Sequence, residues 1–451
     1  MRVHFIKGNN TIAFFPDSLR FFVINEKTED ILKAHINCED TEAITGKFGI
    51  SANDYMDFIS KINKLAQTVQ ADNVKTPAAR MDKKVLDKLA IIVSNSCNLK
   101  CKYCYANGGN YCSEEYLVST EMIDKILSSL YRHFDEINII QIFGGEPMLN
   151  PTAIEHIAVS IENMYEAGKI SKKPMIGMVS NGTLVDDRII KIIKKYKMSV
   201  TVSLDGPPDA NNAMRVFTDG TGTSDVVVNN IKRLKEAIGD SVSIEATYNR
   251  HHVKNGISVA DTIRYVNETF GVTGIHITPV SGLEGSDFVL EDKGPFIESV
   301  ANVFDSLNNK NPINYTLVQR FVNSLQKKSC SSHLCGAGIS TISVSANGDI
   351  YPCFMFTDVD QYKLGNVSDE NVFKSDALLK TTGEFKSFNK LESGKCKDCF
   401  INNICYGCVG INYFESGSPF ETPESYCHMY KAMVEKILIN LSNMHEQEAV
   451  A

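Results

Sequence analysis

The sequence predicts an α/β protein in which a central run of βα units has a smaller unit at either end. Three observations lead to this prediction. Apolar segments of strand length alternate with helical periodicity between residues 89 and 280. Short strands followed by helices occupy residues 1–70. Eight of the 13 cysteines lie between residues 330 and 427, where long periodic segments are scarce.

Composition narrows the class of protein. The 451 residues carry a formal net charge of -8, which argues against a nucleic-acid partner because such proteins usually present a basic face. No apolar run approaches the roughly 20 residues that span a bilayer, so we expect no membrane partner. The N-terminus lacks the unbroken apolar stretch of a signal peptide, and we therefore expect a cytoplasmic protein. Cysteines there stay reduced, so clustered ones indicate metal ligands rather than disulfides.

The N-terminal residues 1–70 are predicted to form a small winged-helix-like unit, followed by a polar linker at 71–84. The expected strands are 3–6, 12–15 and 21–24, and the expected helices are 28–35, 41–46 and 53–67. The unit carries no catalytic residues of its own. It could bind a partner, or it could only stabilise the rest of the protein.

The central region, residues 85–290, is predicted to contain parallel βαβ repeats. Six strands are expected at 89–93, 137–142, 175–179, 200–204, 242–247 and 274–278, with helices at 120–133, 153–165, 186–196, 226–238 and 257–269. Six repeats can form an open doubly wound sheet or a partial barrel. In both arrangements, functional residues gather at the carboxyl ends of the strands.

The C-terminal third is predicted to hold a helical connector at 291–329 and a cysteine-rich domain at 330–430. Because long periodic segments are scarce in that domain, we expect metal rather than an apolar core to hold it together. A helix at 425–444 closes the chain, and residues 431–451 form its end and the tail.

The first cysteine cluster follows the first barrel strand, with the spacing Cys97-x3-Cys101-x2-Cys104. Three thiolates on one loop can hold three irons of a 4Fe–4S cube and leave the fourth iron open to a ligand. The alternative is a structural zinc site, which needs four ligands and could recruit Cys112.

The second cysteine set contains enough thiols for two fully ligated clusters or for two all-cysteine zinc sites. Its members are Cys330, Cys335, Cys353, Cys396, Cys399, Cys405, Cys408 and Cys427. Spacing alone does not decide between iron and zinc, but the neighbouring first cluster favours iron. Cys38 is expected to be a small buried hydrophobic residue.

Four short motifs, in order along successive strands, resemble those of radical S-adenosylmethionine (SAM) enzymes. They are the Cys97–Cys104 loop with Tyr103 before its last cysteine, Gly144-Gly145-Glu146-Pro147, Ser180-Asn181-Gly182-Thr183, and Ser203-Leu204-Asp205-Gly206-Pro207. The resemblance implies a partial (β/α)6 barrel in which Cys97, Cys101 and Cys104 hold a catalytic 4Fe–4S cluster that binds SAM. It further implies that Tyr103, Gly144, Gly145, Glu146, Asn181 and Ser203 contribute to the SAM site, with Tyr103 beside the adenine.

The C-terminal cysteines resemble those of the SPASM domain, including the segment Cys335-x12-Gly348-x4-Cys353. This resemblance implies two auxiliary 4Fe–4S clusters, and thus three clusters in all. One would be held by Cys330, Cys335, Cys353 and Cys408, and the other by Cys396, Cys399, Cys405 and Cys427. Only two residues separate Cys405 from Cys408, where the family usually has three.

Residues 1–70 resemble the recognition element that binds the leader segment of a ribosomally made precursor peptide. Together with the other motifs, this implies a radical SAM oxidoreductase that generates a 5′-deoxyadenosyl radical and cross-links a precursor peptide. The expected product is a cysteine thioether, with a carbon–carbon cross-link as the alternative. The expected electron donor is a low-potential flavodoxin or ferredoxin. One alternative is sulfatase maturation to formylglycine, although Phe354 follows Cys353 where those relatives have an acidic residue. The other is a non-catalytic iron–sulfur or zinc protein.

Overall fold

A nine-stranded sheet runs through the computed structural model, which describes residues 1–67, 74–75, 77, 83–111, 114–282, 285–308 and 315–450. Its strand order is β10-β9-β8-β7-β6-β5-β12-β13-β14. Six strands from the middle of the chain are parallel: β5 (Val85–Ser94), β6 (Glu136–Gly144), β7 (Met175–Ser180), β8 (Ser199–Ser203), β9 (Val242–Tyr248) and β10 (Ile275–Pro279). β5 pairs with β12 rather than with β10, so the six strands form an open, partial barrel. The predicted α/β fold is confirmed.

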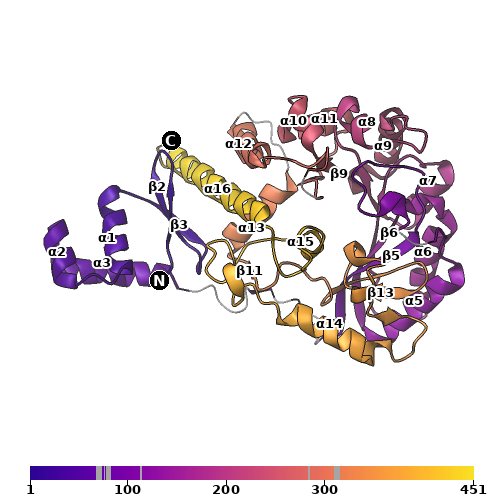
Figure 1. The fold of residues 1–451 in the computed structure, drawn as a ribbon, viewed down its shortest axis with the longest axis horizontal. Coiled ribbons are helices and arrows are strands. Elements are labelled where there is room, and N and C mark those ends of the chain that lie inside the picture. Colours follow the sequence, from indigo (N-terminus) through magenta and orange to yellow (C-terminus); the bar gives the residue numbers. More distant parts are fainter. Residues whose placement is uncertain are drawn as a thin grey trace.

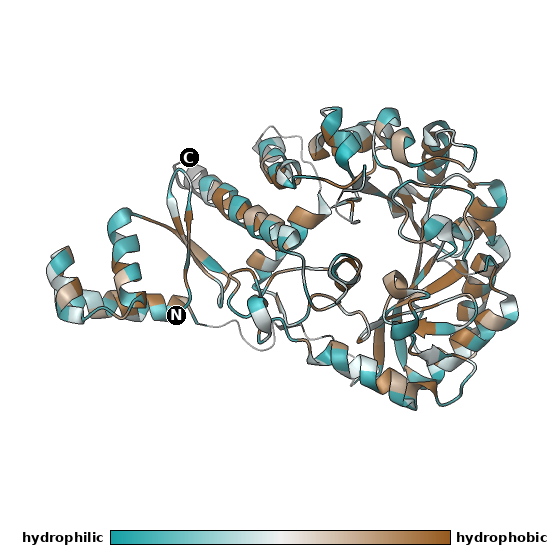
Figure 2. Cartoon of the chain, viewed as in Figure 1, coloured by the Kyte–Doolittle hydropathy of each residue, from teal (hydrophilic) through white to brown (hydrophobic). Residues whose placement is uncertain are grey.

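Helices cover the outer face of the six strands (Figure 1). Hydrophilic and hydrophobic residues alternate along these helices (Figure 2). Leu89 and Ile91 of β5 are fully buried in the large core beneath these helices, whereas Ile92 packs with Phe143 inside the barrel. The helices of this region are α5 (Thr120–His133), α6 (Pro151–Glu166), α7 (Asp187–Lys195), α8 (Pro208–Met214), α9 (Ser224–Ile238), α10 (Arg250–Lys254) and α11 (Val259–Phe270), with short 3₁₀ turns at Asn107–Gly109, Pro147–Leu149 and Gly239–Ser241.

The N-terminal unit is a three-stranded antiparallel sheet followed by three helices, in the predicted order. The strands are β1 (His4–Lys7), β2 (Thr11–Phe15) and β3 (Arg20–Ile24), with β2 central, and the helices are α1 (Glu26–Ile36), α2 (Thr41–Phe48) and α3 (Ala52–Leu65). The sheet packs against α16 (Glu424–Val450), while α1–α3 extend away from the rest of the molecule (Figure 1). Ile6, Ile12, Phe14 and Leu19 belong to the same apolar core as the barrel.

The C-terminal region continues the barrel sheet. α12 (Gly294–Asn308) and α13 (Thr316–Lys327) connect it to the barrel, and β12 (Thr341–Val344), β13 (Asp349–Tyr351) and β14 (Gly365–Asn366) extend the sheet beyond β5. A separate two-stranded pair joins β11 (Cys330–Ser331) to β4 (Val74–Lys75) of the predicted linker. The remaining elements are α14 (Asp376–Ser387), α15 (Val409–Ser416), and 3₁₀ turns at Phe354–Phe356, Asp360–Tyr362, Val372–Lys374 and Gly394–Cys396.

Two predictions for the cysteine-bearing segments are wrong. The C-terminal domain has an apolar core of its own, in which Phe356 contacts Tyr362, Phe385 and Tyr413. Periodicity missed this core because its aromatic residues come singly, from turns and short helices. Cys38 is exposed rather than buried, and it occupies a left-handed conformation (φ 58°) just after α1.

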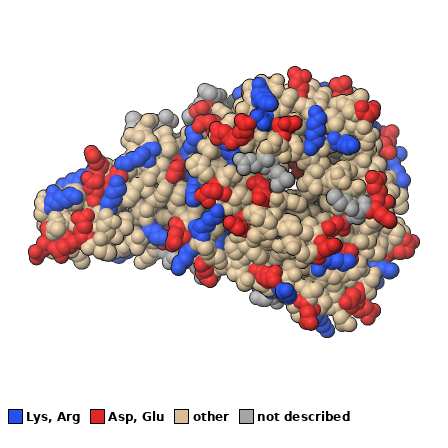
Figure 3. Space-filling view, in the orientation of Figure 1, with Lys and Arg blue, Asp and Glu red and all other residues tan. Residues whose placement is uncertain are grey.

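The surface mixes both signs of charge. Lys and Arg are interspersed with Asp and Glu over the face shown in Figure 3. In the part of the chain that the structure describes, no helix combines the length and apolarity needed to cross a membrane.

Candidate active site and cysteine clusters

The first cysteine cluster lies on the loop that leaves the carboxyl end of β5. Cys97, Cys101 and Cys104 are each partly buried. Burial, together with the nearby charges of Glu146, Cys101 and Cys104, raises the pKa of the Cys97 thiol to about 12. The three thiols therefore share one partly buried site. Since thiolates are the metal-binding form, such a site releases protons when it takes up metal.

Two glycines allow the loop to meet the Gly144–Pro147 segment at backbone contact. A Cβ at Gly145 would lie 2.4 Å from the Ser96 carbonyl oxygen, and one at Gly109 would lie 2.5 Å from the Gly145 Cα. The Glu146 amide donates to the Ser96 carbonyl oxygen at 2.9 Å. Only glycine fits at both positions, and the end of β6 is thereby fixed against the cysteine loop.

Glu146 is fully buried and its carboxylate is satisfied within the protein. It accepts hydrogen bonds from Ser180 Oγ (2.8 Å), the Asn181 amide (2.7 Å) and the Met148 amide (2.9 Å). Burial raises the pKa of this carboxyl group, while these three donors lower it. Glu146 thus ties the ends of β6 and β7 together.

Asn181 and Ser203 hold adjacent positions above the ends of β7 and β8. Asn181 Nδ2 lies 3.7 Å from Cys97 Sγ and donates to Asn98 Oδ1 at 2.9 Å. Ser203 Oγ donates to Glu245 Oε1 at 2.8 Å. The structure therefore brings Asn181 to the cysteine loop itself, whereas Ser203 is engaged with β9.

A buried cation that the sequence analysis missed, Arg215, completes the site. Its Nη1 donates to the Tyr103 hydroxyl at 2.7 Å, and that hydroxyl donates to Asp205 Oδ2 at 2.5 Å. Arg215 Nη1 also lies 3.8 Å from Asp205 Oδ1, and its side chain is only 11% exposed. The pKa of the Cys101 thiol is raised by burial and lowered by the Arg215 charge. A guanidinium that faces thiols can also hold a carboxylate there, because its N–H fork matches carboxylate geometry.

The second cysteine set divides into two groups. Cys335 is exposed at the surface, yet desolvation by the surrounding protein, followed by the Cys408 charge, raises its pKa to about 11. The pKa of Cys353 is raised well above its usual value by burial and then by the charges of Cys408 and Cys335. These three thiols therefore lie together. Cys330 is buried nearby, where Lys390 and Asp17 are the charges that act on it.

Cys396, Cys399, Cys405 and Cys427 surround one cavity of about 190 Å³. Within the described ranges, no three His, Cys, Asp or Glu side chains converge as a site for one metal ion. Four thiols spread around a cavity suit a multi-metal cluster, so these residues fit the group that the sequence implies. Cys112, the possible zinc ligand, lies outside the described residues.

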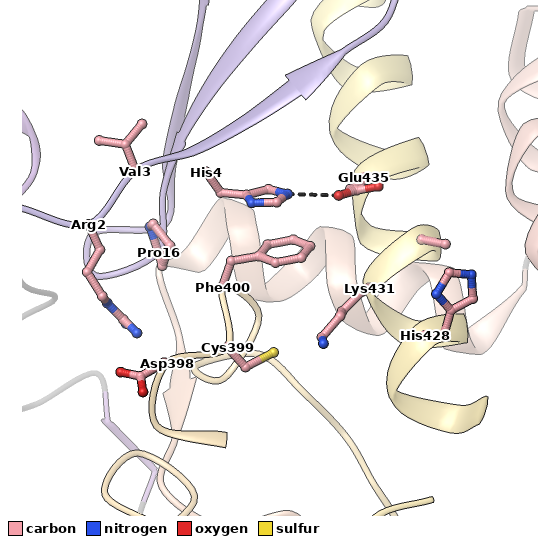
Figure 4. A pocket seen from close by; sticks show the side chains of 11 residues that line it. Arg2, Val3, His4, Pro16, Asp398, Cys399, Phe400, His428, Lys431 and Glu435 are labelled. Carbon is pink, nitrogen blue, oxygen red and sulfur yellow. Dashed lines mark hydrogen bonds and ion pairs between the residues drawn. The ribbon is translucent and has the colours of Figure 1, made fainter. Parts of the chain in front are cut away.

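A second, larger cleft borders the four-cysteine cavity (Figure 4). It encloses about 560 Å³ between the N-terminal strands, the loop around Cys399 and one face of α16. Cys399 and Lys431 line both this cleft and the four-cysteine cavity. The cavity therefore lies directly behind the contact between the N-terminal sheet and α16.

Comparison with known families identifies two domains. Residues 91–262 match the model of the radical SAM superfamily, and residues 335–400 match that of the SPASM iron–sulfur cluster-binding domain. The first match spans the cysteine loop and the strand ends described above. The second contains four of the eight C-terminal cysteines: Cys335, Cys353, Cys396 and Cys399.

Individual proteins resemble most of the chain at low identity. The radical SAM cyclopropyl synthase TigE of Paramaledivibacter caminithermalis is 24% identical over 79% of this chain and 75% of its own. A cysteine-type anaerobic sulfatase-maturating enzyme of Clostridium perfringens is also 24% identical, over 78% of this chain and 96% of its own. The crystal structure of Streptococcus suis SuiB bound to SAM superposes with a TM-score of 0.54 at 19% identity, covering 94% of this chain and 98% of that one.

Proposed function

This chain is a radical SAM enzyme with a C-terminal SPASM domain, and we propose that it cross-links a ribosomally made precursor peptide. Of the possible cross-links, a cysteine thioether is the product we propose. The proposal places the enzyme in the cytoplasm, with a low-potential flavodoxin or ferredoxin as electron donor. The observation that carries the peptide assignment is an open edge in the N-terminal sheet.

That edge is strand β3. Within the described residues it pairs only with β2, and each of its residues is half-buried or exposed. Phe22 and Val23 are 36% and 40% exposed, so two apolar side chains of this strand are accessible to a ligand. An extended peptide can pair with such an edge through its backbone, while the exposed apolar side chains receive its own. A leader held there would raise the effective concentration of the attached core peptide at the barrel.

At the barrel, this chain's residues would hold the cofactors and orient the substrate. Cys97, Cys101 and Cys104 would bind the catalytic cluster and leave one iron for SAM, whose reductive cleavage supplies a 5′-deoxyadenosyl radical. Arg215 would hold the carboxylate of SAM, because its charge faces the cysteine loop. Asn181 would contact the same ligand from the other side of Cys97. Tyr103 and Asp205 would keep the guanidinium in place.

A substitution on the β3 edge tests peptide recognition. Val23→Glu should weaken binding of a precursor peptide encoded beside the gene by about tenfold or more, because a carboxylate would replace an exposed apolar contact at the edge. Ile36→Glu, at the end of α1 and similarly exposed (37%), is the matched control. Binding is measured by fluorescence anisotropy with labelled peptide, and SAM cleavage without peptide should be unchanged. Equal affinity in both variants would contradict the assignment.

Sulfatase maturation is the second candidate function, because the Clostridium relative matches over 96% of its own length. One contact argues against it. Phe354, in the position after Cys353, packs on Phe143 of β6 with ring centroids 4.5 Å apart. Position 354 therefore carries an apolar side chain packed on the barrel, in place of the acidic residue expected of a sulfatase-maturating enzyme. Incubation with a cysteine-containing sulfatase peptide, followed by mass spectrometry for formylglycine, tests this alternative.

A further inference from the structure

Lys390 is a buried cation without an anionic partner. Its side chain is only 1% exposed. Its Nζ donates one hydrogen bond, to the Cys405 carbonyl oxygen at 2.6 Å, although an ammonium has three hydrogens to donate. Among the residues that the structure describes, no carboxylate forms an ion pair with it. Burying an unpaired charge is costly, and an anion bound at this place would offset that cost.

The groups around Lys390 identify that anion. The thiols whose charges act on it are, in order, Cys405, Cys396, Cys330 and Cys335. Cys396 and Cys405 belong to the four-cysteine cavity, which Lys390 also lines. Cys330 and Cys335 belong to the other predicted set. Lys390 therefore lies at the four-cysteine cavity, and the hydrogen bond from its amide to Ser332, between Cys330 and Cys335, brings it close to the other group as well.

A second lysine at the same cavity, Lys395, differs from Lys390 in both its burial and its partners. Lys395 lines the same cavity, but it pairs with Glu424 at 3.0 Å and donates to the Thr422 carbonyl oxygen at 2.8 Å. Its side chain is 47% exposed. Within the described part of the chain, Lys390 has neither solvent nor a carboxylate beside it. Its backbone is fixed by a hydrogen bond from its amide to the Ser332 carbonyl oxygen at 2.9 Å.

We propose that Lys390 is a positioning residue whose positive charge lies close to both auxiliary clusters and raises the reduction potentials of both. The proposal rests on the assignment of the two cysteine groups as iron–sulfur sites. A cluster bound by thiolates is anionic and gains a further negative charge on reduction. A nearby buried cation therefore favours the reduced form, because Coulomb interactions are strong where water is excluded. The remaining N–H groups of Lys390 are free to donate to thiolate or sulfide sulfur.

The test compares four forms of the full-length enzyme, each reconstituted anaerobically. These are the wild type, Lys390→Met, Lys390→Arg, and the control Lys380→Met, which replaces an exposed lysine of α14. Iron and sulfide are measured first, and the auxiliary clusters are then followed by electron paramagnetic resonance during a redox titration. At the wild-type midpoint, the reduced-to-oxidised ratio of the auxiliary clusters should fall about tenfold in Lys390→Met, a shift of about 59 mV for a one-electron couple. The potential of the SAM-binding cluster should not change in any variant. The auxiliary potentials of Lys390→Arg and Lys380→Met should match those of the wild type.

Each outcome decides the proposal. Full iron with wild-type auxiliary potentials in Lys390→Met overturns it. If Lys390→Met loses auxiliary iron, retention in Lys390→Arg supports a role for the charge, whereas loss in both variants means that Lys390 acts through packing and overturns it. A wild-type protein with only about four irons would contradict the cluster assignment itself, and with it this proposal. That failure is visible before any variant is compared.

Discussion

His4 of β1 lies flat against Phe400, with ring centroids 3.7 Å apart and ring planes 7° apart (Figure 4). Phe400 directly follows Cys399, a member of the four-cysteine cavity. The same imidazole meets Glu435 Oε1 of α16 at 2.7 Å. Nearby, Arg2 donates to the Lys397 carbonyl oxygen, and Asn403 donates to that of Pro16. The N-terminal sheet is therefore built into the wall of a predicted cluster site.

This contact changes what a truncation would do. From the sequence, deletion of residues 1–70 is expected to leave the clusters and SAM cleavage intact. In the structure, Ile6, Ile12, Phe14 and Leu19 are at most 4% exposed within the shared core. Their loss would remove on the order of 6–12 kcal/mol of apolar burial, comparable to the stability of a whole domain. We expect a chain starting at residue 68 to be insoluble or to lack auxiliary iron, as measured by sedimentation and iron content. A soluble truncated protein with full iron would show the sheet to be dispensable.

Replacing Cys97, Cys101 and Cys104 together by Ala should remove one cluster of three. Reconstituted iron should fall from about 12 to about 8 per chain, and 5′-deoxyadenosine production should stop. The remaining cysteines lie in separate groups, so their clusters should persist. Cys38→Ala is the control, because Cys38 is exposed and lies in the N-terminal unit; its iron content should equal that of the wild type. SAM cleavage by the triple variant would place the reaction elsewhere.

Arg215→Met should weaken SAM binding without loss of iron. The residue contacts the site through Tyr103 and Asp205 rather than as a cluster ligand. Loss of a charge-assisted hydrogen bond costs about 1.5–3 kcal/mol, which corresponds to roughly 10- to 150-fold in affinity. Equilibrium binding of SAM to the reconstituted enzyme measures this effect. Arg233→Met removes an exposed arginine paired with Asp187, and its affinity should match the wild type.

The sequence predicted the barrel well because its signals are local. Apolar strand segments alternate along the chain with amphipathic helices, and every predicted barrel strand overlaps an observed one. The predicted helix at 120–133 coincides with α5. Arg215 was missed because it stands outside the four motifs and meets Tyr103 across more than a hundred residues. The pairing of β12 with β5 was missed for the same reason, since nothing near Thr341 signals its partner in the barrel. A contact between two distant segments produces no periodic pattern in the sequence of either segment.

The shortened spacing before Cys408 leads to the last prediction. Although only two residues separate Cys405 from Cys408, the structure places Cys408 with Cys335 and Cys353 and leaves Cys405 at the other cavity. Cys408→Ala should therefore remove one auxiliary cluster, about four irons. Adding Cys335→Ala should remove no further iron, because both residues would serve the same cluster. Adding Cys427→Ala instead should remove about four more, because Cys427 lines the separate cavity. If the double variant of Cys408 and Cys335 lost both auxiliary clusters, the two cysteines would have to bind different clusters. The grouping inferred from their mutual charges would then be wrong.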